Sequence, residues 1–417
     1  MADPRRDETR SISRAIHLLG TRRFGTFWAG SLLSNIGTWM QGVAEPWLVL
    51  SLSGSSFLLG LDAFAADGPA WILTLFGGFL ADHRDRRRVI LSCQSIQMLC
   101  PILVVLGILT GTIRVWMIIA LSVVVGVTDA LSMPAFQAIV PSIVSAGDIG
   151  TAIALNSTQF NLSRIIGPAI AGIVMAKYGA LTGFGANALS YVPFLLVTMW
   201  VLPRRVARVV IPAGERISRV WLRAIREVSR EPMLRGALLT VLGTSLLCGP
   251  LIAFSPVLIR EVFHADVSHF AGALAAFGVG GLIGAVVLLV IEGHVDRVRL
   301  CSGAAMLTAV VVGVVAMNRA FAGLVALLGL AGIALTMSNT TANAILQSTA
   351  QDRLRGQTAS LYMLAMRGGL SIGSLVAGVS VSCLGVRRAL LINGVLALIV
   401  QSVIGRYWIH RIRRSIR

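Results

Sequence analysis

The chain has 417 residues, of which 56% are hydrophobic and only 13% are charged. Because soluble domains carry about 25% charged residues, this composition excludes an ordinary soluble protein and indicates an integral membrane protein. The net charge of +18 would fit a nucleic-acid-binding protein as well as a membrane protein, so the positions of the basic residues have to decide between them.

Twelve mostly apolar segments follow one another along the chain, each long enough for a transmembrane helix, which needs roughly 20 residues. They are centred near residues 38, 69, 99, 126, 164, 191, 247, 280, 309, 333, 369 and 398. The first segment is longer than the apolar core of a signal peptide and contains Glu45 and Pro46, so we interpret it as helix 1. Strand alternation with barrel spacing is absent from the sequence. The pattern therefore predicts an all-α membrane protein with twelve transmembrane helices.

The sharpest change in composition lies between the sixth and seventh segments, where Arg, Glu and Pro replace Leu and Val. Three glycines of the fifth segment also recur 206 residues later in the eleventh: Gly150, Gly167 and Gly172 correspond to Gly356, Gly373 and Gly378. Such a recurrence of residues at one fixed offset is typical of a parallel duplication of the two halves. We predict a tail at 1–23, a six-helix half at 24–202, a basic amphipathic linker at 203–233, a second six-helix half at 234–409 and a tail at 410–417.

Basic residues are unequally distributed between the two sides of the predicted membrane. With the N-terminus inside, 28 of the 36 Lys and Arg residues fall on the cytoplasmic side, six on the opposite side, and Arg164 and Arg367 inside helices. This asymmetry favours a multi-pass protein of the bacterial cytoplasmic (inner) membrane with both termini in the cytoplasm, and it disfavours nucleic-acid binding. In the linker, arginines and Trp221 fall on opposite helical faces, which favours a helix on anionic lipid over a solvated helix.

The loop between the second and third segments carries the clearest motif. Residues 78–88 read G-F-L-A-D-H-R-D-R-R-R, and the spacing G-x-L-A-D-x-x-x-R-R-R resembles the signature loop between helices 2 and 3 of the major facilitator superfamily. The stretches N-x-x-x-W-M-Q at 35–41 and R-I-I-G-P-A at 164–169 resemble the branch that contains the enterobactin exporter. This resemblance implies the major facilitator fold and transport by alternating access.

The same resemblance implies a gate at the cytoplasmic side. Asp82 would face the start of helix 11, and Arg86 would pair with Asp129 at the inner end of helix 4. These three residues would stabilise the outward-open state by holding the cytoplasmic ends of the helices together. A solvated charged turn that only orients the helices is the alternative. In the fifth segment, Gly167 and Pro168 resemble a degraded antiporter motif, which favours export.

Two carboxylates inside the predicted helices are candidates for proton coupling. Asp67 lies near the middle of the second segment and Glu45 lies in the first. An ionised side chain there costs about 2.5–3.5 kcal/mol unless it is paired or hydrated. We therefore expect each to face a cavity or a cation, and a purely structural pairing of Asp67 with Arg164 stays open.

Polar and small residues line one face of the first segment, with Asn35, Thr38, Gly42 and Glu45 spaced by three or four. We expect this face to line the substrate cavity together with Trp39, Arg164 and Arg367, because aromatic and guanidinium groups suit aromatic anions. Close helix packing is the alternative for Thr38 and Gly42.

No histidine pair has metal-ligand spacing, and neither a phosphate-binding loop nor a dinucleotide fingerprint occurs in the sequence. We therefore predict no cofactor, no metal and no enzymatic activity. The leading hypothesis is a monomeric secondary transporter that exports an organic, siderophore-like small molecule in exchange for protons. Its partners would be the substrate, protons and the lipid bilayer. A multidrug efflux pump is the first alternative, ahead of a lysolipid transporter, an importer, and a membrane sensor or scaffold.

Overall fold

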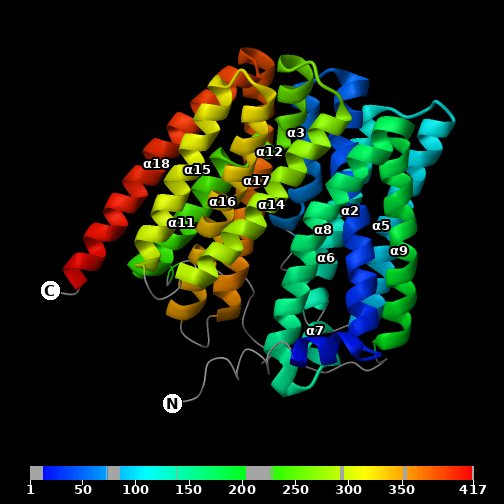
Figure 1. Cartoon of the computed structure of the whole chain (residues 1–417), viewed down its shortest axis with the longest axis horizontal. Coiled ribbons are helices and arrows are strands. Elements are labelled where there is room, and N and C mark those ends of the chain that lie inside the picture. The colour runs from blue at the N-terminus through cyan, green and yellow to red at the C-terminus, as the bar shows by residue number, and fades with distance from the viewer. Residues whose placement is uncertain are drawn as a thin grey trace. The chain divides into compact units, whose positions relative to one another are not determined.

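A computed structural model describes residues 13–71, 73, 85–137, 139–202, 226, 228, 230–291, 295–350 and 355–415. Within these ranges all regular secondary structure is helical (Figure 1). The chain divides into two compact units, one formed by Met1–Leu48 with Ile72–Val209 and the other by Val49–Trp71 with Val210–Arg417. The predicted halves, 24–202 and 234–409, follow the chain without this exchange, and their bounds stay a prediction.

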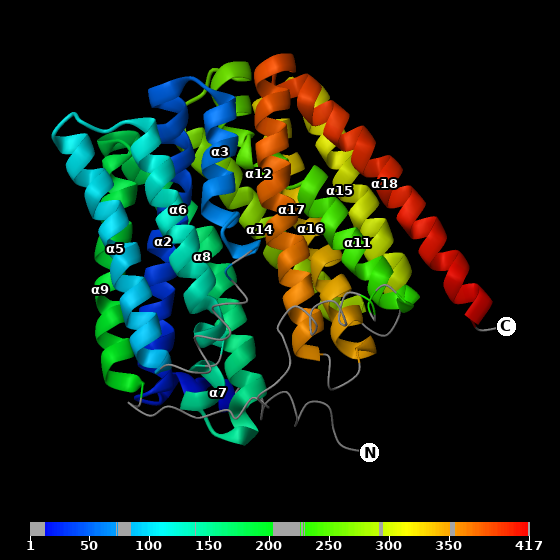
Figure 2. The same ribbon diagram turned by 180° about the vertical axis from the view of Figure 1, so that it is seen from behind.

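The first unit is a bundle built mainly from long helices (Figure 2). Its helices are α2 (Phe24–Ser53, whose last turn belongs to the second unit), α5 (Arg86–Leu109), α6 (Val115–Gln137), α7 (Ile139–Ile143), α8 (Ile149–Tyr178) and α9 (Leu181–Val201). Local sequence sets several of the ends. The Asp85 carboxylate caps α5 by accepting a hydrogen bond from the Arg87 amide at 3.0 Å, and Gly179 ends α8 with a φ of 75°.

The second unit contains ten helical elements among the residues that the structure describes. These are α3 (Ser56–Asp67), α11 (Pro232–Leu247), α12 (Pro250–Ala253), α13 (Ser255–Val257), the π-helix η2 (Leu258–Val262), α14 (Val267–Ile291), α15 (Arg297–Met317), α16 (Phe321–Thr349), α17 (Arg355–Leu384) and α18 (Val386–Ser415). Ser55 caps α3 and Asp296 caps α15. Gly385, with a φ of 79°, makes the turn between α17 and α18.

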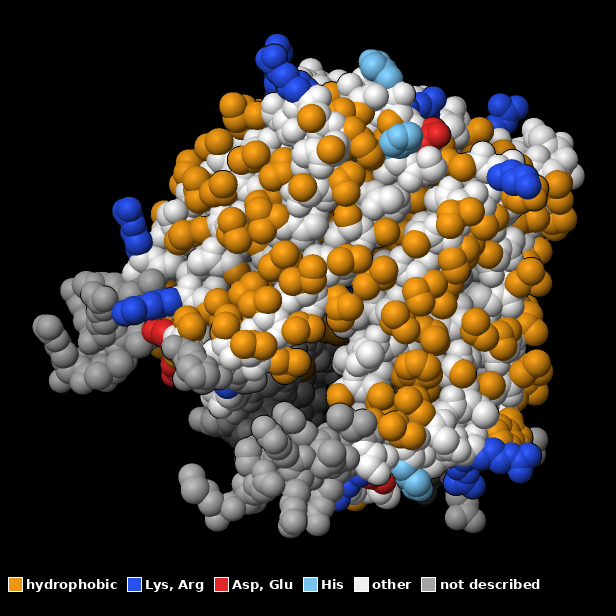
Figure 3. Space-filling model, in the orientation of Figure 1, with side chains coloured by type: hydrophobic (Ala, Val, Ile, Leu, Met, Phe, Trp, Pro, Cys, Tyr) orange, Lys and Arg blue, Asp and Glu red, His pale blue; other side chains and the backbone are white. Residues whose placement is uncertain are grey.

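Nine helices among the described residues are long and apolar enough to cross a membrane. They match nine of the twelve predicted segments. Of the other three, the first and fifth correspond to α2 and α8, each 30 residues long, and the second begins with α3. Hydrophobic side chains cover the helices in the face shown in Figure 3, while Lys and Arg gather at its upper and lower margins. The predicted all-helical membrane fold is confirmed.

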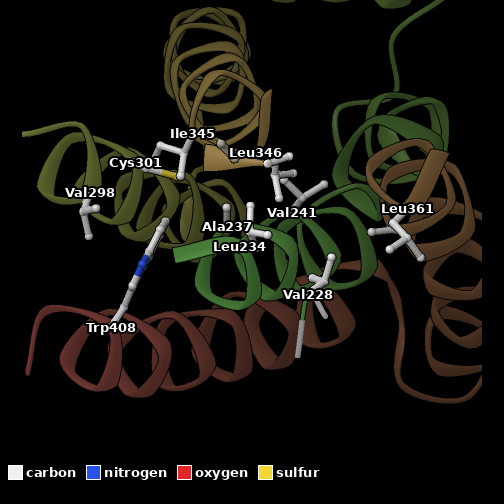
Figure 4. Packing of buried hydrophobic residues seen from close by; sticks show 13 residues of the cluster. Val228, Leu234, Ala237, Val241, Val298, Cys301, Ile345, Leu346, Leu361 and Trp408 are labelled. Atoms are coloured by element: carbon white, nitrogen blue, oxygen red, sulfur yellow. The ribbon is translucent and has the colours of Figure 1, made fainter. Parts of the chain in front are cut away.

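Buried apolar clusters hold each unit together. In the second unit, Trp408 of α18 reaches α11 (Figure 4), and a Cβ added at Gly236 would lie only 2.4 Å from its indole ring. A side chain at this glycine would therefore displace the tryptophan. In the first unit, Phe136 and Phe194 stack with ring centroids 5.3 Å apart. Such packing is what fixes helix positions within lipid, where the hydrophobic effect between helices is weak.

A close contact between α3 and α17 explains why residues 49–71 belong to the second unit. A Cβ added at Gly60 would lie 2.5 Å from the Ser374 carbonyl oxygen and 3.0 Å from the Gly378 Cα atom. The two backbones can approach this closely only because glycine stands at both positions. Gly378 is one of the three glycines that the predicted duplication singled out.

Candidate functional site

The carboxylate of Glu45 is held by hydrogen bonds from two helices of the first unit. Gln41 lies one turn earlier on α2, and its Nε2 donates to Glu45 Oε2 at 2.7 Å. The Ser122 hydroxyl of α6 donates to Glu45 Oε1 at 2.8 Å. Both carboxylate oxygens therefore accept hydrogen bonds from side chains whose donors point at them. Glu45 is a half-buried intramembrane carboxylate with specific partners, as its position in an apolar helix predicts.

The network continues through buried amides of α9. Asn187, whose side chain is 3% exposed, donates from Nδ2 to Gln41 Oε1 at 2.6 Å. The Ser190 hydroxyl in turn donates to the Asn187 backbone carbonyl at 2.7 Å. Gln41, Ser122 and Asn187 are not among the site residues that the sequence predicts. Their signal was present, because an amide alone among apolar residues in a membrane helix needs a partner.

A second buried polar pair lies on α5. Gln94 donates to Gln97 at 2.9 Å, and Gln97 Oε1 lies 3.5 Å from the Tyr191 hydroxyl of α9. Asp129 of α6, a predicted gate residue, acts electrostatically on Tyr191 and on Cys93. The interior of the first unit is thus a set of hydrogen-bonded polar groups that join α2, α5, α6 and α9.

The predicted polar stripe of α2 lies on a face that is partly open. Thr38 is exposed, and its hydroxyl donates to the Ser34 carbonyl at 3.1 Å. Asn35 is half-buried, and a Cβ added at Gly42 would meet no atom within 4 Å. Thr38 and Gly42 are both exposed in the described structure, and their role in lining a cavity or in helix packing stays a prediction.

Trp39 and Arg164 come together between α2 and α8. The guanidinium carbon of Arg164 lies 5.8 Å from the centroid of the Trp39 ring, and Phe160 contacts the same ring edge-on at 6.0 Å. Gly167 allows the approach, because a Cβ there would lie 2.5 Å from Trp39 Cβ. The sequence predicts both Trp39 and Arg164 as residues of the substrate cavity, and the fold of the first unit makes these two neighbours.

Asp67 pairs with Arg367 inside the second unit. Helix α3 ends at Asp67, and Gly68 and Pro69 follow as a turn, since proline lacks the N–H that a continuing helix needs. Asp67 Oδ1 lies 3.9 Å from Arg367 Nη1 of α17, with side chains 30% and 27% exposed. From the sequence, Asp67 could either pair with Arg164 or face a cavity. In the structure its carboxylate lies beside Arg367.

The predicted gate is only partly visible. Asp82 lies outside the described residues, and Arg86 is the half-buried first residue of α5. Among the ion pairs described at this turn, Arg88 Nε lies 3.9 Å from Asp85 Oδ2. The pairing of Arg86 with Asp129 stays a prediction.

The model of the transmembrane secretion effector family matches residues 15–414. The chain is 26% identical to the staphyloferrin A transporter of Staphylococcus aureus over 92% of this chain and 96% of that protein. It is 24% identical to the multidrug efflux pump Tap of Mycolicibacterium fortuitum over 88% and 93%.

Solved structures of transporters share the fold. A bacterial homologue of the human lysosomal transporter Spinster has a TM-score of 0.71 at 15% identity, covering 94% of this chain and 99% of that chain. The nucleoside transporter NupG has a TM-score of 0.70 at 12% identity, covering 93% and 99%.

Proposed function

The chain belongs to the transmembrane secretion effector family of the major facilitator superfamily, and from this premise we propose that it exports an organic small molecule in exchange for protons. It is a small-molecule transporter rather than an enzyme. In the proposed cycle, the protein works as a monomer in the bacterial inner membrane, with both termini in the cytoplasm. Each half-cycle exposes the substrate site to one side of the membrane.

The observation that carries this proposal is the presence of two partnered carboxylates within apolar helices. Glu45 accepts hydrogen bonds from Gln41 and Ser122, and Asp67 pairs with Arg367. Ionisable groups at such positions are expensive and usually belong to ion or proton pathways. A carboxylate that can take up a proton on one side of the membrane and release it on the other supplies the coupling that an antiporter needs.

The pair of Asp67 and Arg367 supports a simple exchange. A proton on Asp67 removes the negative charge that holds the Arg367 guanidinium. The guanidinium can then bind an acidic group of the substrate with hydrogen bonds. Loss of the proton restores the ion pair and displaces the substrate. Proton and substrate would thus compete for the same pair of side chains, which is the behaviour of an exchanger.

The substrate class that these residues favour is an aromatic, hydrogen-bonding anion of siderophore-like character. Trp39, Phe160 and Arg164 offer two aromatic rings and a guanidinium together, and a relative is the staphyloferrin A transporter. A second candidate is drug efflux. The neutralisation of Arg367 by Asp67 favours uncharged or cationic compounds, and other relatives are the efflux pump Tap and a macrolide efflux protein.

Proton flux into proteoliposomes that contain the purified protein tests the proposal. An imposed substrate gradient should drive proton movement, and Asp67→Asn should abolish uphill transport while downhill exchange continues. Glu261→Gln is a matched control, because it removes an exposed carboxylate. A wild-type protein that moves substrate without proton flux would refute the antiport.

A comparison of deletion and complemented cells tests the substrate class. Siderophore secretion and accumulation of the cationic dye ethidium are measured in both. We expect siderophore secretion to depend on the gene. If only ethidium is expelled, drug efflux replaces our first choice.

A further inference from the structure

Trp71 lies against the backbone of α17, next to the pair of Asp67 and Arg367. Its indole covers Gly368, because a Cβ added at this glycine would overlap the ring atoms Nε1, Cε2 and Cζ2. Arg367 is the preceding residue of α17, and consecutive Cα atoms are about 3.8 Å apart. The ring therefore rests beside the residue whose guanidinium lies 3.9 Å from the Asp67 carboxylate.

The local sequence brings Trp71 to the same place from the side of α3. Gly68, which caps α3, has a φ of −59° and a ψ of −42°, and these are helical values. The Trp71 amide donates to the Gly68 carbonyl at 3.1 Å. The chain thus keeps turning through Pro69, and Trp71 follows Asp67 by about one helical turn. Positions four residues apart neighbour each other on a helical surface.

The indole of Trp71 is only partly covered by protein. Trp408 shows the fully packed alternative, since it also lies against a glycine, Gly236, and is 1% exposed. Trp71 is 38% exposed, so part of its ring stays open. Asp67 and Arg367 beside it are partly exposed too. Charged groups within a membrane almost always face the bundle interior or water rather than lipid, so we expect the open side of this group to meet a polar substrate.

We propose that Trp71 is a specificity-determining residue that stacks on the aromatic ring of the substrate while Arg367 binds its acidic group. Aromatic rings attract each other beyond the area that they bury, and a guanidinium binds a carboxylate with charge-assisted hydrogen bonds. The ligand class is a flat aromatic anion whose acidic group is attached close to the ring. This inference rests on the proposed function, because it takes Asp67 and Arg367 as the pair that exchanges proton and substrate.

Calorimetric titration of the full chain in lipid nanodiscs tests the role of Trp71 with two anions. The first is 2-naphthoate, and the second is its saturated analogue decahydro-2-naphthoate, which has the same charge and a similar size but no aromatic ring. The wild type should bind 2-naphthoate more tightly. Trp71→Leu should weaken binding of 2-naphthoate by about 2–10-fold and change that of the analogue less. Arg367→Gln should weaken the binding of both anions.

Gly368→Ala tests the position of the ring and leaves the three side chains of the site in place. Its methyl group would displace the indole, so the preference for 2-naphthoate should fall. Trp116→Leu is the matched control, because it removes a tryptophan that is 69% exposed at the start of α6 in the other unit. Both affinities should stay unchanged in this control.

The orientation of the ring has a test of its own. The fluorescence that is lost in Trp71→Phe belongs to Trp71, and brominated lipid in the nanodisc quenches tryptophans that face the acyl chains. We expect this part of the fluorescence to be quenched less than the part that is lost in Trp116→Phe. Equal or stronger quenching would place the Trp71 ring in lipid and overturn the proposal.

Three binding results would also overturn the role of Trp71. These are equal affinities of the wild type for the two anions or no binding of either, unchanged binding of 2-naphthoate in Trp71→Leu, and an equal loss in Trp116→Leu. If Trp71→Leu does not fold, the Gly368→Ala titration decides. Asp67→Asn removes the carboxylate that competes for Arg367 and should tighten the binding of both anions. Failure of that result alone would refute the proposed exchange at the pair and leave the role of Trp71 standing.

Discussion

Removing one charge from the pair of Asp67 and Arg367 should cost more stability than removing both. Asp67→Asn leaves the Arg367 guanidinium inside the membrane helices without its carboxylate, and Arg367→Gln does the reverse. The double variant replaces both charges with amides of similar size. We expect both single variants to be less stable than the double variant, because only the single variants contain one charge without the other.

The structure sets the size of this effect. A lone charge in the middle of a membrane helix costs about 2.5–3.5 kcal/mol. The two side chains are 30% and 27% exposed and their charged atoms are 3.9 Å apart, so partial hydration lowers the cost. We expect each single variant to lose about 1–2 kcal/mol, which is a factor of about 5–30 in the ratio of folded to unfolded protein. The double variant should recover most of that loss.

The loss of stability is measured by thermal unfolding of the detergent-purified variants, monitored by size-exclusion chromatography. The coupling between the two substitutions comes from the double-mutant cycle. Proton-driven transport by the same proteins provides the functional readout, and the double variant should be stable but uncoupled. Additive losses in the cycle would show that the two residues do not stabilise each other, and a coupled double variant would remove this pair from the proton pathway.

Three further predictions concern packing, gating and pH. Gly60→Ala places a methyl group 2.5 Å from a carbonyl oxygen of α17 and should destabilise the protein by about 1–3 kcal/mol. The control Gly303→Ala adds a methyl group with no atom within 4 Å and should be neutral or stabilising in the same thermal assay. Asp82→Asn should reduce transport in proteoliposomes without reducing membrane insertion, and normal transport would contradict the predicted gate. Hydrogen bonds, led by the one from Ser268, hold the pKa of Asp266 well below its usual range. The stabilising effect of the ionised Asp266 should therefore be complete above its unfolded pKa of about 3.9 and be lost as the pH falls through the lower folded pKa. The thermal midpoints of Asp266→Asn and of the wild type should differ at neutral pH and converge in strong acid.

The sequence alone determined the class of protein and most of the helix positions. The length of an apolar run is a local property, and the bilayer demands the same length of every helix, so hydropathy predicts the spans directly. The segments interrupted by polar residues were also recognised, because α2 and α8 stay helical around Glu45 and Arg164. Even the need of Asp67 and Glu45 for partners followed from the cost of charge in lipid.

Only the tertiary structure decided which partners these groups have. Asp67 and Arg367 are 300 residues apart in the chain, and Gln41 and Asn187 are 146 apart. A carboxylate in an apolar helix can be satisfied by any cation or donor that a neighbouring helix presents at the same depth, and the sequence offered several. The choice depends on how the helices turn and pack, which close contacts such as that of Gly60 with α17 and Gly167 with Trp39 determine.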